Sequence, residues 1–232
     1  MKIAVIPARG GSKRIPKKNT QTFNGKPIIE WVINLLKKSK LFDLIIVSTD
    51  DNDIATISTN LGADVPFIRP SDLADDFTGT TEVIAHATEW LIKNGFQLNA
   101  VCCVYATAPL IFLDDLNDGY HELISGDWDY VFSATSYTSS IYRAFKKNQE
   151  GGVEMLFPEK FNARSQDLPK IYHDAAQFYW GQPEAWLNHK PIFSKKSKPI
   201  MIPSWRVQDI DTIDDWKKAE CVFNILNSER VD

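Results

Sequence analysis

The sequence predicts an α/β fold in which a mostly parallel sheet is flanked by helices. Short, uninterrupted apolar runs alternate with amphipathic segments along the first 136 residues. This alternation is typical of parallel strands that helices cover on both faces. The chain has 232 residues, of which 44% are hydrophobic, and this is enough for one domain with a sizeable core. We therefore expect a single domain over residues 1–232.

The first 62 residues are predicted to form two strand–helix units. Residues 2–7 form a buried apolar strand, and residues 27–39 form a helix because their apolar residues recur at helical spacing. Residues 44–51 form the second strand, and the helix after it spans residues 51–62 and ends at Gly62. The residues expected to face inward from the first helix are Ile28, Trp31, Val32, Leu35 and Leu36.

The same alternation continues to residue 136. Apolar runs over residues 63–68, 99–107 and 130–136 predict three further strands. Amphipathic segments over residues 81–95 and 113–125 predict the helices between them. In a parallel sheet of this kind, a ligand lies beyond the carboxyl ends of the strands.

The alternation stops in residues 137–171, which contain a Gly-Gly pair, two prolines and mixed polarity. We interpret this segment as an inserted, β-rich dimerisation arm. A strand over residues 175–181 and a helix over residues 214–228 then complete the domain. Thr212 and Asp215 have the spacing of a capping box at the start of that last helix.

Charge and cysteine content limit the classes of partner. The chain has 30 acidic and 26 basic residues, and a net charge of -4 argues against nucleic-acid binding. Its three cysteines lack the spacing of a metal site, and we expect them to be reduced in a cytoplasmic protein. No apolar run reaches the roughly 20 residues of a membrane span, and no signal segment is recognisable, so we expect no membrane association.

A basic loop with two glycines follows the first predicted strand. The stretch AVIPARGGSKRIPKKN, residues 4–19, contains five cations and no acid. Glycines let a backbone approach a ligand closely, and cations bind phosphates, so the loop suits a triphosphate. It matches neither the P-loop nor the dinucleotide-binding motif. The alternative is a solvated basic loop, in which Lys13, Arg14 and Lys17 are exposed flanks.

Asp209 and Asp211 form the second candidate site. On an extended chain, side chains two residues apart point the same way. Two carboxylates together with substrate phosphates are a common set of ligands for Mg²⁺. The alternative is an acidic helix cap, which we favour for Asp214 and Asp215. Arg206, just upstream, is interpreted as an ion-pair partner of the two aspartates.

The third candidate site is the stretch IRPSDLADDFTGT, which begins at residue 68. Arg69 follows a predicted strand, and Thr78 and Thr80 precede a helix. Their hydroxyls and backbone donors suit a base edge or a ribose, although threonines also cap helices. By the same reasoning Asp50 and Asp51 are interpreted as caps of the helix that follows them.

In this order, the stretches IPARGGSKRIPKKN, VSTDD, RPSDLADDFTGT, QDLP and DIDTIDDW resemble the acylneuraminate cytidylyltransferases, the CMP–sialic acid synthetase family. The resemblance covers nearly the whole chain. It implies a Rossmann-like nucleotidyltransferase that joins CTP and a nine-carbon 2-keto sugar acid, releases pyrophosphate and depends on Mg²⁺. It also implies a homodimer in which the inserted arm reaches the partner's active site.

The family's site residues carry over motif by motif. Arg9, Lys18, Asp209 and Asp211 would be catalytic, and the two aspartates would hold the metal. No motif supplies a clear general base, so a metal-bound hydroxide and an aspartate both stay open. The implied nucleotide-binding residues are Ala8, Arg9, Gly10, Gly11, Ser12, Lys13, Lys18, Asn19, Arg69, Thr78 and Thr80.

The stretches YATAP, HDAAQFYWG and RVQDIDT resemble the pseudaminic acid cytidylyltransferase branch of the family. Sialate-specific members carry QPTSPL and NGAIY instead. The less hydroxylated pseudaminate would suit Tyr105 and the aromatic residues 178–180, which the alternative interpretation places in the core of a strand. The implied sugar-binding residues are Tyr105, Ala106, Thr107, Arg164, Gln166, His173 and Gln177.

Three alternatives to cytidylyl transfer onto pseudaminate stay open. The same reaction on N-acetylneuraminate or legionaminate differs only in the sugar pocket. A sugar-1-phosphate nucleotidylyltransferase would share the fold class and the basic first loop. A non-catalytic nucleotide-binding protein would keep the fold without needing Asp209 or Asp211.

Overall fold

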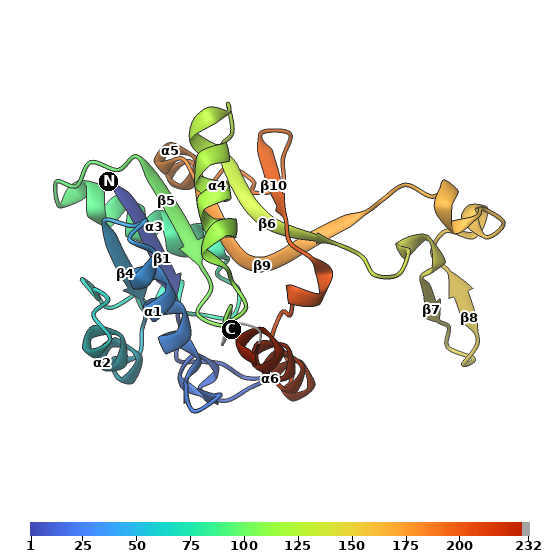
Figure 1. The fold of residues 1–232 in the computed structure, drawn as a ribbon, viewed down its shortest axis with the longest axis horizontal. Helices are drawn as coiled ribbons and strands as arrows, with labels where there is room; N and C mark the ends of the chain where they lie inside the picture. Colours follow the sequence, from blue (N-terminus) through green and yellow to red (C-terminus); the bar gives the residue numbers. More distant parts are fainter. Residues whose placement is uncertain (229–232) are drawn as a thin grey trace.

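A six-stranded sheet forms the centre of the computed structural model, which describes residues 1–228 (Figure 1). The strand order is β10-β6-β9-β5-β1-β4, and β9 is antiparallel to both of its neighbours while the other pairs are parallel. The prediction of a mostly parallel sheet is therefore confirmed. The strands are β1 (Lys2–Pro7), β4 (Leu44–Ser48), β5 (Ala100–Val104), β6 (Tyr130–Ser136), β9 (Tyr172–Gly181) and β10 (Ser197–Met201).

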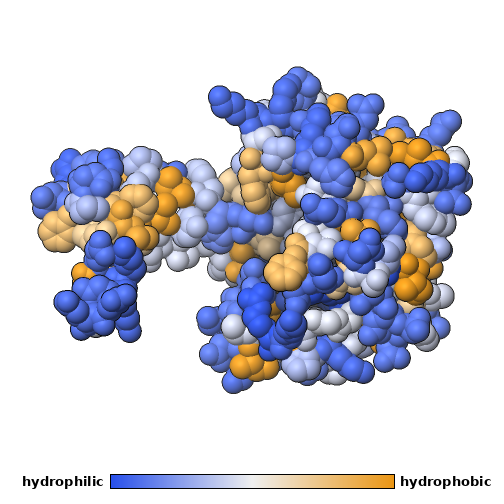
Figure 2. All heavy atoms as spheres, turned by 180° about the vertical axis from the view of Figure 1, so that it is seen from behind, coloured by the Kyte–Doolittle hydropathy of each residue, from blue (hydrophilic) through white to orange (hydrophobic). Residues whose placement is uncertain are grey.

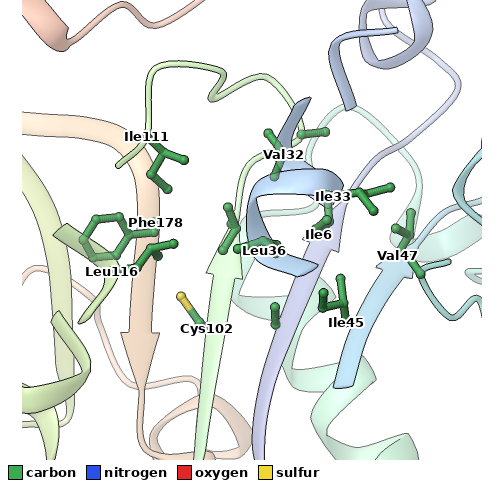
Figure 3. Close-up of a cluster of buried hydrophobic side chains, with 14 of the residues drawn as sticks. Ile6, Val32, Ile33, Leu36, Ile45, Val47, Cys102, Ile111, Leu116 and Phe178 are labelled. Atoms are coloured by element: carbon green, nitrogen blue, oxygen red, sulfur yellow. The ribbon is translucent and has the colours of Figure 1, made fainter. Parts of the chain in front are cut away.

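Helices cover both faces of the sheet, which explains the uninterrupted apolar runs. On one face α1, α2 and α4 pack over the strands, and Figure 3 shows Val32, Ile33 and Leu36 of α1 against them. On the other face α3 and α5 pack against Ile3, Val5 and their neighbours. The helices are α1 (Ile28–Ser39), α2 (Asn52–Asn60), α3 (Thr80–Lys93), α4 (Leu113–Ser125), α5 (Pro183–Leu187) and α6 (Ile213–Ser228).

A third apolar cluster joins α6 to the loop that follows β1. Ile15 of that loop packs with Trp216 and Phe223 of α6, and Ile210 is buried in the same cluster. Trp216 and Phe223 also meet the ring of Phe23 edge-on. The C-terminal helix therefore fixes the basic loop and the Asp209–Asp211 segment in one unit.

The predicted strand over residues 63–68 is wrong. Only two isolated bridges form there, between Asp64 and Ile46 and between Ile68 and Thr49. Pro66 lies between these points and has no N–H to donate to a ladder. The segment is thus an extended connection along the edge of the sheet.

Several short elements escaped the sequence patterns. They include α5, β10 and a small hairpin formed by β2 (Thr22–Phe23) and β3 (Lys26–Pro27). The predicted strand over residues 175–181 also begins earlier, at Tyr172. These short elements have two to five residues and, unlike β4 and β5, carry no uninterrupted apolar run that would mark them.

Residues 137–171 project away from the sheet as an arm (Figure 1). Its strands are the hairpin of β7 (Phe145–Lys147) and β8 (Val153–Met155), and the rest is short 3-10 helices, turns and irregular chain. The Arg143 guanidinium donates to the carbonyls of Phe161 and Ala163 and holds the far end together. Figure 2 shows apolar residues among the polar ones on the arm, and Phe145, Val153, Leu156 and Phe161 are each more than half exposed.

Candidate active site

A cleft of about 410 Å³ lies at the carboxyl ends of the parallel strands. Its walls come from the loop after β1, residues 69–80, residues 105–107 and the segment before α6. The structure thus brings the three candidate stretches into one site. The predicted site residues that line it are Arg9, Ser12, Lys13, Lys18, Asn19, Arg69, Thr78, Thr80, Tyr105, Ala106, Thr107, Asp209 and Asp211.

Three hydrogen bonds hold the loop after β1 in shape. The Asn19 Nδ2 donates to the carbonyl of Arg9 at 2.9 Å, and the Lys18 Nζ donates to the carbonyl of Ile210 at 2.7 Å. The Gly10 N–H donates to the Asp50 Oδ1 at 3.0 Å. The loop is therefore a defined structure, in which the backbone is fixed and the cationic side chains remain at the cleft.

Asp50 and Asp51 have different roles. Asp51 caps α2, because its Oδ1 accepts from the N–H groups of Asp53 at 2.8 Å and Ile54 at 3.0 Å. Asp50 instead bonds the basic loop through Gly10. The interpretation of both as caps is right for Asp51 and wrong for Asp50, whose place beside the loop depends on the parallel pairing of β1 with β4.

The cations of the loop are neutralised by carboxylates on both sides of the cleft. Arg9 donates to the Asp76 Oδ1 at 2.8 Å and to the Asp75 carbonyl at 2.7 Å, and Lys13 also pairs with Asp76. Hydrogen bonds from Lys13 and Arg9 hold the pKa of Asp76 below its usual value. On the opposite side, the Asp211 Oδ1 lies 2.8 Å from Arg14 and 3.5 Å from Lys18.

Asp209 and Asp211 lie on either side of Ile210, whose side chain is fully buried in the cluster around α6. Both carboxylates line the cleft, as the spacing predicts. Partial desolvation raises the pKa of Asp209, and the neighbouring charge of Asp211 raises it further. A cation between the two carboxylates would relieve that repulsion.

The donor set fits Mg²⁺. Within residues 1–228 no group of three or more histidine, cysteine, aspartate or glutamate side chains could hold a metal ion. Mg²⁺ commonly uses only one or two carboxylates and takes its other ligands from phosphates and water. The two aspartates opposite a basic loop match that pattern.

Arg69 forms the buried back of the cleft. Its Nε donates to the Ser48 Oγ at 3.1 Å, and a second guanidinium nitrogen donates to the Ser48 carbonyl. Burial lowers the pKa of Arg69 to about 10, against the opposing effect of Asp50.

At the N-terminus of α3, the Thr80 hydroxyl lies 2.7 Å from that of Tyr105. Burial also raises the pKa of Tyr105, so its hydroxyl stays neutral.

Comparison with known proteins assigns the family. A family model described as cytidylyltransferase matches residues 3–225. The chain belongs to the cytidylyltransferase family. The pseudaminic acid cytidylyltransferase of Campylobacter jejuni serotype O:2 is 40% identical over 223 residues, which cover 96% of each chain. The CMP-N,N'-diacetyllegionaminic acid synthase of Legionella pneumophila is 32% identical over 98% of this chain and 97% of its own.

The fold agrees with solved structures of other cytidylyltransferases. A CMP:2-keto-3-deoxy-manno-octonic acid synthetase complexed with CTP superposes with a TM-score of 0.71 at 14% identity, covering 97% of this chain and 99% of that one. A 4-diphosphocytidyl-2C-methyl-D-erythritol synthase gives 0.66 at 12% identity, covering 95% and 97%. The predicted Rossmann-like nucleotidyltransferase fold and the predicted family are confirmed. No helix within residues 1–228 of this cytidylyltransferase has the length and apolarity to cross a membrane.

The predicted sugar-binding residues of the cytidylyltransferase fall in three places: the cleft, the arm and β9. Tyr105, Ala106 and Thr107 line the cleft. Arg164 and Gln166 lie exposed on the arm, where Arg164 pairs with Asp167 at 2.8 Å. One chain therefore does not bring this set together.

His173 and Gln177 lie on β9 and do not line the cleft. The His173 ring packs on Tyr137 at the base of the arm. Gln177 is buried, and its Nε2 donates to the carbonyl of Arg206 at 3.0 Å.

Several further residues discussed from the sequence lie outside the cleft. Phe178, Tyr179 and Trp180 are buried, as the core interpretation of these aromatics expects. Ala8 is also buried, and neither it nor the two loop glycines line the cleft. At α6, the Asp215 Oδ2 accepts from the Thr212 N–H at 2.9 Å and the Asp215 N–H donates to the Thr212 Oγ1 at 3.2 Å, which confirms the predicted capping box.

Sequence reasoning missed or misplaced three carboxylates that the structure ties to the site. Asp76 binds two loop cations, and Asp174 accepts a hydrogen bond from the Tyr179 hydroxyl behind Tyr105. Asp115 pairs with Arg206 at 2.8 Å, so the predicted pairing of Arg206 with Asp209 and Asp211 is wrong. The contacts of Asp76 and Asp115 join residues far apart in sequence, so no local pattern marks them. Asp174 and Tyr179 lie five residues apart on β9, where an odd spacing would place the two side chains on opposite faces of a regular strand.

Gly10 is required by a close approach of the loop to α2. A Cβ at this position would lie 2.5 Å from the Asp51 Oδ2 and 2.9 Å from its Cβ, and Asp51 cannot move without losing the helix cap. Gly10→Ala is expected to lower the free energy of unfolding by about 1–3 kcal/mol and to weaken CTP binding. Gly11→Ala is the matched control, because a Cβ there meets nothing within 4 Å. Thermal melting and calorimetry with CTP check both, and equal behaviour of the two variants would contradict the steric account.

Asp76 pairs with Arg9 and Lys13, two loop cations that are predicted to bind the phosphates of the nucleotide. Asp76→Asn frees Arg9 and Lys13 for phosphates, and we expect CTP to bind about two- to fivefold more tightly, the size typical of exposed ion pairs. Asp53→Asn is the control, because Asp53 pairs with Lys17 outside the cleft. Weaker CTP binding by Asp76→Asn would show that this carboxylate organises the site instead.

Proposed function

We propose that the protein transfers the cytidylyl group of CTP to pseudaminic acid and releases pyrophosphate. The observation that supports pseudaminic acid as the substrate is the 40% identity, over 96% of both chains, to a pseudaminic acid cytidylyltransferase. The cleft supports the nucleotide half, since it sets a basic loop opposite two carboxylates at the carboxyl edge of the sheet. The alignment with the C. jejuni relative covers 96% of both chains, which supports a sugar pocket within the same chain.

The proposed reaction is an in-line displacement at the α-phosphorus. The anomeric oxygen of the sugar acid forms a bond to this phosphorus, the bond to the bridging oxygen of pyrophosphate breaks, and the anomeric proton passes to a base. Such reactions depend mainly on positioning and charge stabilisation. Arg9 and Lys18, which line the cleft, would stabilise the charge on the departing pyrophosphate.

Asp209 and Asp211 would hold Mg²⁺, which neutralises phosphate charge and orients the triphosphate when it is bound. Arg14 and Lys18 pair with the Asp211 carboxylate. Binding of the nucleotide therefore requires an exchange of partners: the two cations turn to the phosphates, and the carboxylate is freed. Chelation with EDTA is expected to abolish turnover, and added Mg²⁺ to restore it.

We further propose that two copies of the chain form a homodimer through the arm. Phe145, Val153, Leu156 and Phe161 of the arm are each more than half exposed, and burial against a second copy would stabilise them. Arg164 and Gln166 lie on this arm, outside the cleft of their own chain, and would reach the site of the partner. Light scattering tests this directly, and a mass of one chain at micromolar concentration would contradict it.

We also propose a cytoplasmic location. Cys102 and Cys103 are buried free thiols, and Cys221 is an exposed free thiol. Reduced cysteines are typical of the cytoplasm, where disulfides rarely persist. Localisation of a tagged full-length chain by cell fractionation checks this point.

A panel of sugar acids tests the substrate. The protein is incubated with CTP, Mg²⁺ and, in turn, pseudaminate, N-acetylneuraminate and legionaminate, and pyrophosphate release is measured. Pseudaminate is expected to be turned over with the highest kcat/KM. Preference for legionaminate or sialate would overturn the sugar assignment but keep the reaction. Turnover of a sugar 1-phosphate with UTP, TTP or GTP would overturn the reaction itself, and nucleotide binding without turnover on any acceptor would make the protein non-catalytic.

A further inference from the structure

A buried ion pair lies beside the cleft, outside its lining. The Arg206 guanidinium donates to both oxygens of Asp115, at 2.8 and 3.1 Å, and the two side chains are only 8% and 13% exposed. The guanidinium also lies 4.0 Å from the centre of the Phe112 ring. This two-pronged contact fixes orientation as well as distance.

The pair connects two walls of the cleft. Arg206 precedes Asp209 by three residues, whereas Asp115 lies in the first turn of α4, after the loop that begins with Tyr105. The backbone of Arg206 is held as well, because its carbonyl accepts from the Gln177 Nε2 of β9 at 3.0 Å. The segment that carries the two aspartates is thereby tied to the loop that carries the sugar-side residues.

The other end of the same segment is also anchored. Asp215 accepts from the Thr212 N–H at 2.9 Å and from the Gln208 Nε2 at 3.1 Å. The carbonyl of Ile210 accepts from Lys18 at 2.7 Å. Residues 206–212 are therefore held at both ends and in the middle, and the Arg206–Asp115 pair is the anchor that connects them to the sugar side.

Stability alone is a weak reason for such a pair. Two buried charges lose their hydration, and a well-packed apolar pair of similar volume often gives equal or greater stability. What an apolar pair lacks is a fixed orientation. A bidentate guanidinium is suited to hold a backbone segment in one place, as residues that contact metal ligands indirectly commonly do.

We propose that Arg206 and Asp115 are positioning residues for the transfer reaction. Together they hold the Asp209–Asp211 segment at a set distance from the Tyr105–Thr107 wall, so that the triphosphate and the acceptor meet in line. This inference rests on the proposed role of Asp209 and Asp211 in catalysis. Neither Arg206 nor Asp115 lines the cleft, so both would act through the segment they hold.

Two single variants and one double variant test the pair. Arg206→Lys keeps the positive charge but loses the bidentate geometry of the guanidinium. Asp115→Asn keeps the shape of the side chain but loses its negative charge. Arg206→Met combined with Asp115→Leu removes both charges and preserves packing, so its melting temperature should stay near that of the wild type. Glu122→Gln is the control, because Glu122 lies on the same helix and pairs with Lys198 at 2.5 Å, away from the cleft.

All three test variants are expected to lower kcat by about 10- to 100-fold. The KM for CTP should change by less than about threefold, since the nucleotide contacts are intact. Hydrogen exchange in residues 207–212 should become about tenfold faster. Glu122→Gln should alter none of these quantities. Wild-type kcat, or wild-type exchange in residues 207–212, in the folded double variant would overturn the proposal.

Asp209→Asn separates this inference from the proposed function. If that variant keeps wild-type turnover, the catalytic role of the aspartates fails. Faster hydrogen exchange in residues 207–212 of Arg206→Lys would then show that the Arg206–Asp115 pair only stabilises this segment. The proposed role of the pair in positioning for catalysis would be overturned. If Asp209→Asn is inactive while Arg206→Lys is fully active with normal exchange, the proposed function stands and only the positioning role fails.

Discussion

Asp211→Asn is expected to reduce turnover about 10³-fold while the protein folds normally. The substitution keeps the size of the side chain and removes the charge that would bind Mg²⁺. It also removes the ion partner of Arg14 at 2.8 Å and of Lys18 at 3.5 Å. The Asp211 side chain is 34% exposed, and ion pairs at such exposure contribute about 0–1 kcal/mol, so the melting temperature should change little.

Asp214→Asn is the matched control for this experiment. Asp214 lies in the same acidic stretch, but its side chain is 79% exposed and pairs only weakly with Lys217 at 4.0 Å. Its turnover should equal that of the wild type. The two variants are compared by their initial rates of pyrophosphate release and by their thermal melting. Equal turnover of Asp211→Asn and wild type would remove Asp211 from the metal site.

Arg9→Ala is expected to lower kcat/KM for CTP by about 100-fold, the loss typical of removing one donor to a developing negative charge. Arg9 lies two residues after the end of β1, lines the cleft and has its guanidinium held toward Asp75 and Asp76. The loop itself should persist, because Asn19 bonds the Arg9 carbonyl, which alanine retains.

Lys17→Ala is the control from the same loop. Lys17 is 74% exposed, pairs with Asp53 at 3.5 Å and does not line the cleft. Steady-state kinetics with varied CTP should give wild-type values for Lys17→Ala and a large loss for Arg9→Ala. Similar small losses of kcat/KM in both variants would show that the loop contributes only a general electrostatic attraction for the nucleotide.

Much of the fold was predictable because its core elements carry clear local patterns of apolar residues. The apolar face of α1 and the uninterrupted runs of β1 and β5 are local patterns that depend only on nearby residues. The predicted strand over residues 63–68 failed for the opposite reason. Its backbone meets the neighbouring edge at only two points, and Pro66, which has no N–H to donate, was the local feature that argued against a strand.

The nucleotide side of the site was predictable for a related reason. Arg9, Lys13, Lys18 and Asn19 belong to one loop, so their proximity follows from the chain itself. Asp209 and Asp211 share a face because they flank one buried residue. The sugar side was predicted less well, since its candidates are divided between the cleft, the arm and the interior of β9.

By itself the sequence determined that a basic loop follows the first strand and that two carboxylates stand at alternate positions near the C-terminus. These features are short-range, and chain connectivity alone brings their members together. Only the tertiary structure decided that Asp76, 67 residues from Arg9, occupies the cations of that loop, and that Asp115, 91 residues from Arg206, holds the aspartate segment in place. Such pairs depend on the path of the whole chain, because each charge binds whichever opposite charge the packed sheet and helices bring within reach.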